Sequence, residues 1–175
     1  MAYKGEKMKL ITELTDQTVL GLEGLSKKKP RRTSRAIVIN DEGLYAVVYT
    51  RRLRLHSLPG GGIERGETEE EALKREILEE TGCECERIEP LGKIFENRGH
   101  ANHTALSYYY VVHTSTKNGK PHYTKGEMYL GTSIKWCTFE EAEHLIKDVI
   151  HDTEQKKFLQ ARDVAALREY RESFL

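Results

Sequence analysis

Runs of β-branched and aromatic residues recur along the chain between polar stretches, and they predict a sheet of several strands. The clearest pair covers residues 33–41 and 44–50, and the sequence NDEG at their junction is typical of a hairpin turn. Later runs predict strands at residues 90–98, 104–115 and 129–138, and two short strands are expected near residues 9–14 and 19–22. The basic sequence SKKKPRR before the hairpin is expected to be a solvated loop.

Start and stop signals of a helix surround residues 69–81. Thr68 and Glu71 have the spacing of a capping box, and Gly82 follows the last turn. The expected apolar contacts of this helix come from Leu73, Ile77 and Leu78.

Two further helices are predicted at the end of the chain, at residues 139–148 and 153–173. Apolar residues in the second recur at roughly helical spacing, which is typical of an amphipathic packing helix. These residues are Phe158, Val164, Ala165, Leu167 and Tyr170. Strands and helices therefore interleave, and we expect an α+β fold in which a mixed β-sheet lies between helices.

We expect three parts along the chain. Residues 1–30 would be an N-terminal extension with possible short strands, and residues 31–150 would form the main domain. Residues 151–175 would be a C-terminal helix that packs on that domain. A chain of 175 residues has the length of a single domain with short extensions.

Composition excludes several classes of protein. Lys plus Arg and Asp plus Glu both number 28, so no overall charge favours nucleic acid or an anionic membrane. The opening sequence MAYKGEKMKLITELTD lacks the apolar core of a signal peptide, and no apolar run approaches bilayer length, so we expect a cytoplasmic protein without a membrane partner. Three cysteines without a C-x-x-C pair indicate neither a disulfide framework nor a four-ligand zinc site.

The helix at residues 69–81 concentrates negative charge on one face. Glu76, Glu79 and Glu80 are spaced i, i+3 and i+4, so their side chains converge, and like charges at this spacing destabilise a helix. Arg75 can neutralise part of that charge but not all of it. A divalent cation such as Mg²⁺, which prefers oxygen ligands, would offset the rest; a solvated acidic face is the alternative.

The residues before this helix favour the metal. Gly60, Gly61 and Gly62 follow a proline, and glycines let backbone amides approach a ligand closely. The sequence is neither a Walker motif nor a dinucleotide fingerprint. Strand, glycine turn and carboxylate helix together indicate a site for metal-bound phosphate.

The stretch from Gly61 to Cys83 resembles the Nudix box, G-x5-E-x7-R-E-U-x-E-E-x-G-U, where U is a bulky apolar residue. Eight positions match at the pattern's spacing: Gly61, Glu67, Arg75, Glu76, Ile77, Glu79, Glu80 and Gly82. Cys83 departs from the pattern in the last apolar position, where cysteine can act as a small hydrophobic residue.

The resemblance to MutT-like Nudix hydrolases implies an α/β/α sandwich that cleaves a nucleoside diphosphate linked to another moiety, with Mg²⁺ or Mn²⁺ as cofactor. It implies that Glu79 and Glu80 are metal ligands, and that Glu76 is a ligand or the general base. Arg75 would orient that glutamate, and Glu67 would be structural or assist the metal.

Residues outside the box are weaker candidates. A further carboxylate from a loop often completes such sites; Glu127 is the first candidate and Glu96 the second, although each is also consistent with a surface glutamate. Arg52 and Arg54, close before the glycines, are candidates for contact with substrate phosphates.

The resemblance leaves the substrate open. Accessory sequence motifs of relatives that act on ADP-ribose, dinucleoside polyphosphates or coenzyme A are absent near the box. Their absence favours a nucleoside triphosphate or a similar small nucleotide, intact or damaged. The alternatives are an ADP-ribose or nucleotide-sugar diphosphatase, removal of pyrophosphate from RNA 5′ ends, and a nucleotide-sensing domain without catalysis. The protein would be a monomer or a homodimer.

Overall fold

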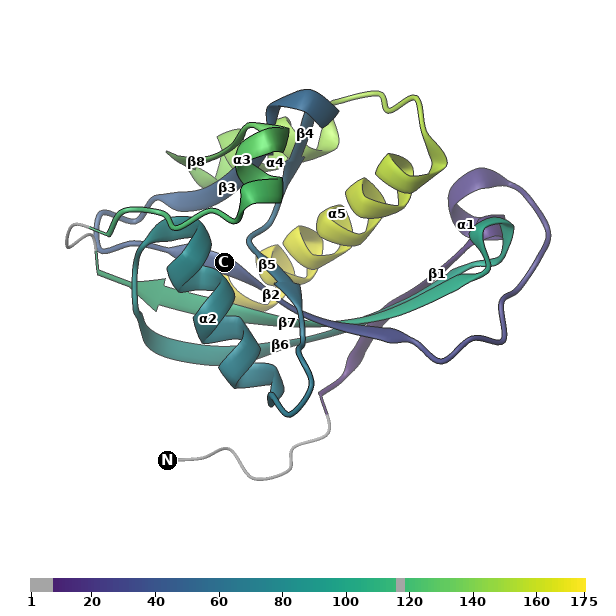
Figure 1. Cartoon of the computed structure of the whole chain (residues 1–175), viewed down its shortest axis with the longest axis horizontal. Coiled ribbons are helices and arrows are strands. Elements are labelled where there is room, and N and C mark those ends of the chain that lie inside the picture. Colours follow the sequence, from purple (N-terminus) through teal and green to yellow (C-terminus); the bar gives the residue numbers. More distant parts are fainter. Residues whose placement is uncertain (1–7, 116–118) are drawn as a thin grey trace.

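The computed structural model describes residues 8–115 and 119–175 and contains a mixed β-sheet between helices (Figure 1). The strands are β1 (Leu10–Thr15), β2 (Arg31–Ile39), β3 (Tyr45–Thr50), β4 (Leu55–Ser57), β5 (Gly60–Gly62), β6 (Cys85–Arg98), β7 (His103–Thr114) and β8 (Thr132–Cys137). Their order is β1-β6-β7-β2-β3-β4, while β5 pairs with β2 and β8 with β3. Because β1–β6 and β2–β7 are parallel and the other pairs are antiparallel, the predicted α+β fold with a mixed sheet is confirmed.

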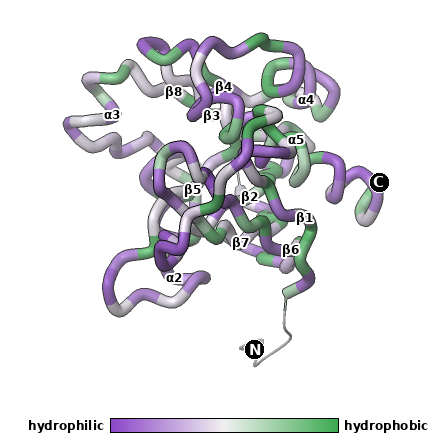
Figure 2. Tube along the Cα trace, turned by 90° about the vertical axis from the view of Figure 1, so that its right-hand side faces the viewer, coloured by the Kyte–Doolittle hydropathy of each residue, from purple (hydrophilic) through white to green (hydrophobic). Residues whose placement is uncertain are grey.

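Helices cover both faces of this sheet. Helix α2 (Glu69–Thr81) lies on one face, and α4 (Phe139–Lys147) and α5 (Glu154–Phe174) lie on the other (Figure 1). Figure 2, a quarter turn away, shows α2 and α5 on opposite sides of the central strands. The continuous apolar run of β2 follows from this arrangement, since Ala36 and Val38 face α2 while Ile37 and Ile39 face the other layer.

Local signals fix α2 as the sequence predicted. The Thr68 hydroxyl accepts from the N–H of Glu71, and the Glu71 carboxylate accepts from the N–H of Thr68. At the other end Gly82 adopts a left-handed conformation (φ 71°). Leu73 and Ile77 are fully buried against the sheet, but the expected apolar contact of Leu78 is wrong because its side chain is 42% exposed.

Several boundaries differ from the sequence prediction. The strand expected at residues 19–22 is wrong: Thr15 caps a short helix, α1 (Asp16–Leu20), which Gly21 ends in a left-handed turn. A second short helix, α3 (Lys125–Leu130), occupies the start of the segment predicted as a strand at residues 129–138. The basic segment at residues 26–32 is a loop only in part, because β2 already begins at Arg31.

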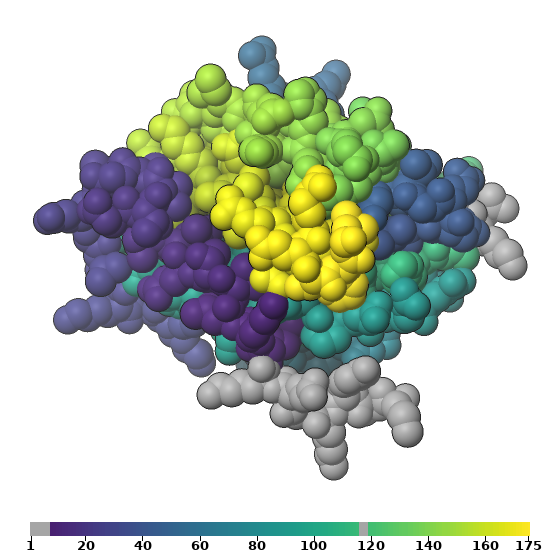
Figure 3. Space-filling view, turned by 180° about the vertical axis from the view of Figure 1, so that it is seen from behind, coloured from purple at the N-terminus to yellow at the C-terminus, as the bar shows by residue number. Residues whose placement is uncertain are grey.

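The C-terminal helix α5 completes the back of the molecule. Figure 3 shows this face, with the yellow end of α5 between the purple N-terminal segment and the green segment of α4. Phe158, Ala166, Leu167 and Tyr170 are its buried apolar residues, and they join the core that the sheet shares with α4. Of the helices in the described part of the chain, none is long and apolar enough to cross a membrane.

Candidate active site

The Arg75 guanidinium lies among carboxylates of α2 and of the segment just before it. Its Nε donates to Glu67 Oε1 (2.7 Å) and its Nη1 to Glu76 Oε1 (2.8 Å), while Glu79 Oε2 lies 3.6 Å away. Its Nη2 also donates to the carbonyl oxygen of Gly62 (2.9 Å). The hydrogen bonds from Arg75 are the main reason that the pKa of Glu67 falls to about 2. One cation therefore orients Glu67 and Glu76, lies close to Glu79 and joins them to the glycine segment.

Glu80 is the most deeply buried of the three clustered glutamates. The residue is 7% exposed, and the backbone N–H of Gly60 donates to its Oε2 (2.7 Å). Burial raises the pKa of Glu80 to about 8, although the Gly60 hydrogen bond and the nearby charge of Arg35 act in the opposite direction. Burial likewise raises the pKa of Glu76, against the effect of Arg75. The protein thus holds carboxylates where their charge is costly.

The three glycines were expected to form a turn, and the structure shows that they form the short strand β5, paired with β2. Gly61 faces α2: a Cβ atom added there would lie 2.3 Å from Glu76 Oε1. Gly60 and Gly62 face the other way, toward Arg35 and Arg31. The absence of side chains therefore lets β5 lie directly against Glu76.

Replacing Gly61 with alanine is expected to reduce turnover by roughly 100-fold, because the new Cβ would displace the Glu76 carboxylate or the strand, and a misplacement of about 1 Å costs that much. Steady-state kinetics would measure the loss. Gly126→Ala is the matched control, since a Cβ there would come no closer than 3.9 Å to Thr124 Oγ1. Equal activity of both variants would contradict the role of this close contact.

The donor set fits a divalent cation. Glu76, Glu79 and Glu80 supply oxygen ligands from one helix face, and one guanidinium does not balance their charge. Within the described residues, no three acidic, histidine or cysteine side chains already stand in the geometry of a metal site. Arg75 donates to Glu76 and the N–H of Gly60 donates to Glu80, so a cation would compete with these donors.

Comparison with known proteins decides the family. A family model described as the NUDIX domain matches residues 29–161, which is more than half of the chain. The chain belongs to the Nudix family. It is accordingly a hydrolase that acts on phosphoric anhydride bonds.

Solved structures of Nudix proteins share this fold. A NUDIX hydrolase from Nitrosomonas europaea is 20% identical, with a TM-score of 0.61, over 82% of this chain and 90% of the other. A MutT NUDIX hydrolase from Burkholderia pseudomallei is also 20% identical, with a TM-score of 0.52, over 77% of this chain and 98% of the other. At these identities the likeness shows the fold of this Nudix chain and not its substrate.

The two candidate carboxylates outside the Nudix box, Glu127 and Glu96, lie in different surroundings. Glu127 lies on α3, where its carboxylate accepts from the N–H of Thr124 (2.7 Å), and its charge contributes to the raised pKa of Glu80. Glu96 is fully buried in β6 and pairs with Arg98 (2.6 Å). The structure thus brings Glu127 into electrostatic reach of the box and gives Glu96 a different partner.

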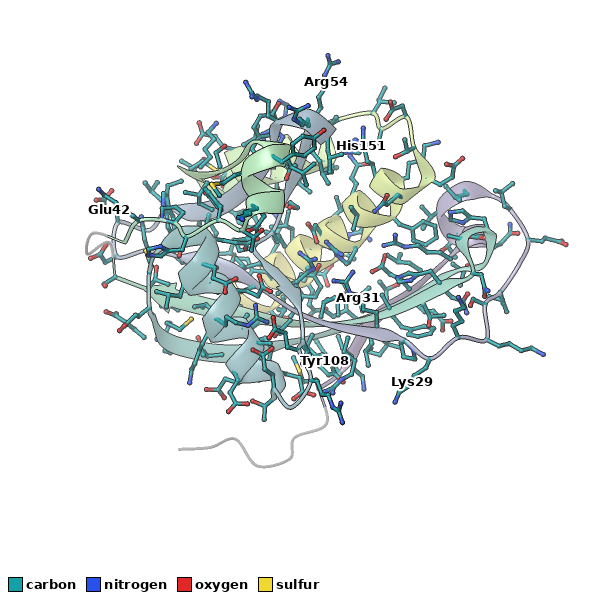
Figure 4. The ribbon with its side chains drawn as sticks, in the orientation of Figure 1. Lys29, Arg31, Glu42, Arg54, Tyr108 and His151 are labelled. Carbon is teal, nitrogen blue, oxygen red and sulfur yellow. The ribbon has the colours of Figure 1, made fainter. Side chains whose placement is uncertain are left out.

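The two arginines proposed for phosphate contact lie near α3. Arg52 donates to the carbonyl oxygen of Tyr129 (2.6 Å) and stacks over its ring. Arg54 has a left-handed backbone (φ 51°), and Figure 4 shows its side chain pointing away from α2. Neither side chain is therefore brought to the carboxylates of the box.

The sequence did not point to a buried contact that holds the segment before β5. Asp163 on α5 accepts from the N–H of Leu58 (2.9 Å), the hydroxyl of Tyr109 (2.6 Å) and Nε of Arg162 (3.0 Å). Asp163 and Tyr109 are fully buried, and Arg162 is 3% exposed. Helical periodicity identifies the apolar face of α5 but gives no sign that two adjacent charged residues are inside.

Proposed function

We propose that this Nudix protein is a divalent-metal-dependent pyrophosphohydrolase of a small nucleotide, with a nucleoside triphosphate, intact or damaged, as the favoured substrate and a nucleoside monophosphate as product. One observation carries the proposal: α2 holds Glu76, Glu79 and Glu80 on one partly desolvated face, where the Arg75 guanidinium contacts only Glu76 and Glu79 among them. Such a face is costly for a protein that binds no cation.

The residues that would hold Mg²⁺ or Mn²⁺ are Glu76, Glu79 and Glu80, with Glu127 of α3 as the added carboxylate. A bound divalent cation supplies positive charge that screens the phosphate oxygens and makes a water molecule more acidic. Its ligands are oxygens, in keeping with Mg²⁺. Glu127 would have to release the N–H of Thr124 to take part.

The other steps belong to the chain itself. Arg75 orients Glu76 through a 2.8 Å hydrogen bond, and Glu76 would accept the proton of the attacking water. Burial raises the pKa of Glu76 from its ordinary value, which brings it closer to the pH at which a general base is most effective. The lack of a side chain on Gly61 lets β5 lie directly against Glu76, and the N–H of Gly60 donates to Glu80.

A product assay tests the proposal. Purified protein with Mg²⁺ or Mn²⁺ would be given nucleoside triphosphates, oxidised analogues, nucleotide sugars, ADP-ribose, dinucleoside polyphosphates and RNA with a 5′ triphosphate. The Glu79→Gln protein serves as blank. Rapid release of a nucleoside monophosphate from a triphosphate, absent in the blank, is the expected result. Hydrolysis of another class of compound in the panel would identify that class as the substrate instead. Binding of a compound in the panel, with no hydrolysis of any of them, would indicate nucleotide sensing.

Removal of divalent cations is expected to stop turnover. EDTA should abolish product release, and an excess of Mg²⁺ or Mn²⁺ should restore it, because the carboxylates alone cannot screen a pyrophosphate from its nucleophile. The far-ultraviolet circular dichroism spectrum should stay unchanged, since the cores on both faces of the sheet do not depend on the cation. Hydrolysis that continues at full rate in EDTA would rule out the mechanism.

A further inference from the structure

A cavity of about 390 Å³ lies between the sheet and α5, with walls from β2, β6 and β7. Its volume is within the range of small-molecule sites. Six basic side chains line it: Arg31, Arg35, Arg98, Arg162, His100 and His103. Of the described residues on its wall, Glu96 alone carries a carboxylate, and none is Phe, Tyr or Trp. The cavity is therefore rich in positive charge.

Part of that charge is already paired in the wall. Arg98 Nη2 donates to Glu96 Oε1 (2.6 Å), and Arg162 Nε donates to Asp163 Oδ1 (3.0 Å). The same Arg162 lies 3.9 Å from Glu96 Oε2. These pairs help to fix the shape of the wall, although Glu96 Oε2 itself has no hydrogen-bond partner within the described part of the chain.

Among the described residues, neither Arg31 nor Arg35 forms an ion pair with a carboxylate. The Arg35 Nη1 atom donates to the carbonyl oxygens of Leu58 (3.3 Å) and Gly60 (3.2 Å), and its Nε is buried without a hydrogen-bond partner. Arg31 is exposed at the mouth, and Figure 4 shows its side chain between β2 and α5. Both guanidinium groups thus face the same cavity without an ion pair of their own, although Arg35 lies within electrostatic reach of Asp163 and Glu80.

Arg31 and Arg35 lie on one side of strand β5, and Glu76 of α2 lies on the other. A Cβ atom on Gly62 would lie 3.0 Å from Nη2 of Arg31, and one on Gly60 would lie 2.9 Å from Cγ of Arg35. On the opposite side of the same strand, Gly61 faces Glu76. Gly60 contacts both groups, because its carbonyl oxygen accepts from Arg35 (3.2 Å) and its N–H donates to Glu80 (2.7 Å).

The lining indicates what the cavity would accept. A nucleobase would be stabilised by stacking on aromatic rings, and the described wall offers none except histidine imidazoles. An apolar group would leave the guanidinium groups without hydrogen bonds. Phosphate oxygens match the fork of donors that arginine presents, and each charge-assisted hydrogen bond is stronger than a neutral one.

We propose that this cavity binds a phosphate group of the substrate that lies outside the scissile pyrophosphate, with Arg31 and Arg35 as its ligands. The inference rests on the proposed function and narrows it to nucleotides with a further phosphate. That phosphate is carried on the sugar or at the end of the phosphate chain.

Calorimetry with inorganic phosphate and inorganic pyrophosphate in EDTA tests the site without turnover. We expect wild-type protein to bind these anions, and Arg31→Gln to weaken binding about tenfold or more, since hydrogen bonds to charged groups contribute about 1.5–3 kcal/mol each. Arg87→Gln is the control, because Arg87 pairs with Glu89 on the exposed start of β6. No binding, or equal binding by wild type and Arg31→Gln, would overturn the proposal.

Matched nucleotides then locate the phosphate. Adenosine 3′,5′-bisphosphate should bind more tightly than AMP if the sugar carries it, and ATP more tightly than ADP if the phosphate chain does. A preference that Arg31→Gln removes supports the proposal in either pair, and no preference in both pairs contradicts it.

The Glu79→Gln protein separates this inference from the proposed function. If it keeps Arg31-dependent binding while wild type hydrolyses nothing in the product assay, the proposed function fails and the anion site stands. If wild type hydrolyses a nucleotide at a rate and KM that Arg31→Gln leaves unchanged, the proposed function stands and the anion site fails.

Discussion

The Glu80→Gln protein is expected to lose turnover by roughly 100-fold or more while it remains folded. Glutamine keeps the size of the side chain, and its carbonyl oxygen can still accept from the N–H of Gly60, which donates to Glu80 Oε2 at 2.7 Å. What disappears is a negative charge on a residue that is 7% exposed. Steady-state kinetics with saturating Mg²⁺ and Mn²⁺ would measure the loss.

The same variant should be more stable than wild type when metal is absent, and increasingly so at high pH. The pKa of Glu80 is about 8 in the folded state, above the ordinary 4.5. A group whose pKa is raised by folding gives its full stabilisation at a pH below its unfolded-state pKa. That stabilisation is lost as the pH rises through its folded-state pKa. Glutamine does not titrate. In EDTA, the melting temperature of the variant should therefore exceed that of wild type by an amount that grows as the pH rises from 4.5 to about 8.

Glu70→Gln is the matched control for both measurements. Glu70 lies in the first turn of the same helix, is about half exposed and pairs with Lys74. We expect near-normal turnover and a change in stability within about 0.5 kcal/mol. Near-normal turnover of the Glu80→Gln protein would instead contradict the assignment of Glu80 as a metal ligand.

Replacing Asp163 with asparagine is expected to lower the free energy of unfolding by about 3 kcal/mol. All three of its partners, Leu58 N–H, Tyr109 hydroxyl and Arg162 Nε, are donors to the carboxylate. An amide offers a single acceptor oxygen and turns its NH₂ group toward at least one donor, which leaves a buried charge without compensation. Chemical denaturation would measure the loss.

A control and a kinetic readout complete that experiment. Asp152→Asn makes the same chemical change in a side chain that is 79% exposed, and we expect an effect within about 0.5 kcal/mol. Because Asp163 also holds Leu58, two residues before β5, turnover should fall in Asp163→Asn even at temperatures where the protein is folded. An unchanged rate would show that the contact stabilises the fold without positioning the site.

The parts that the sequence predicts well are those determined by neighbouring residues. Helix α2 follows from Thr68, Glu71 and Gly82, all within one element, and its bounds agree with the prediction. Helix α3 carries a capping box of the same kind, Thr124 with Glu127, and its Gly131 also adopts a left-handed turn. That signal was present in the sequence, and it was missed because the apolar run after it favoured a strand.

Contacts between distant segments are the parts that the sequence does not reveal. Arg52 and Arg54 are close to the glycines in sequence, yet the arginines beside β5 in space are Arg31 and Arg35. Their position follows from the pairing of β5 with β2, which depends on the whole sheet. The buried Asp163 was equally hidden, because charged residues on a helix are usually solvated.

Strand β5 also sets a constraint on how this protein can change in length. Successive residues of a strand point to opposite faces, so a single residue inserted between Leu58 and Gly60 would move Gly61 to the arginine side and bring a neighbouring residue against Glu76. Substitutions at many other surface positions alter one contact at a time. A one-residue insertion here would exchange the two faces at once, and we expect evolutionary variation in this segment to be in residue type and not in number.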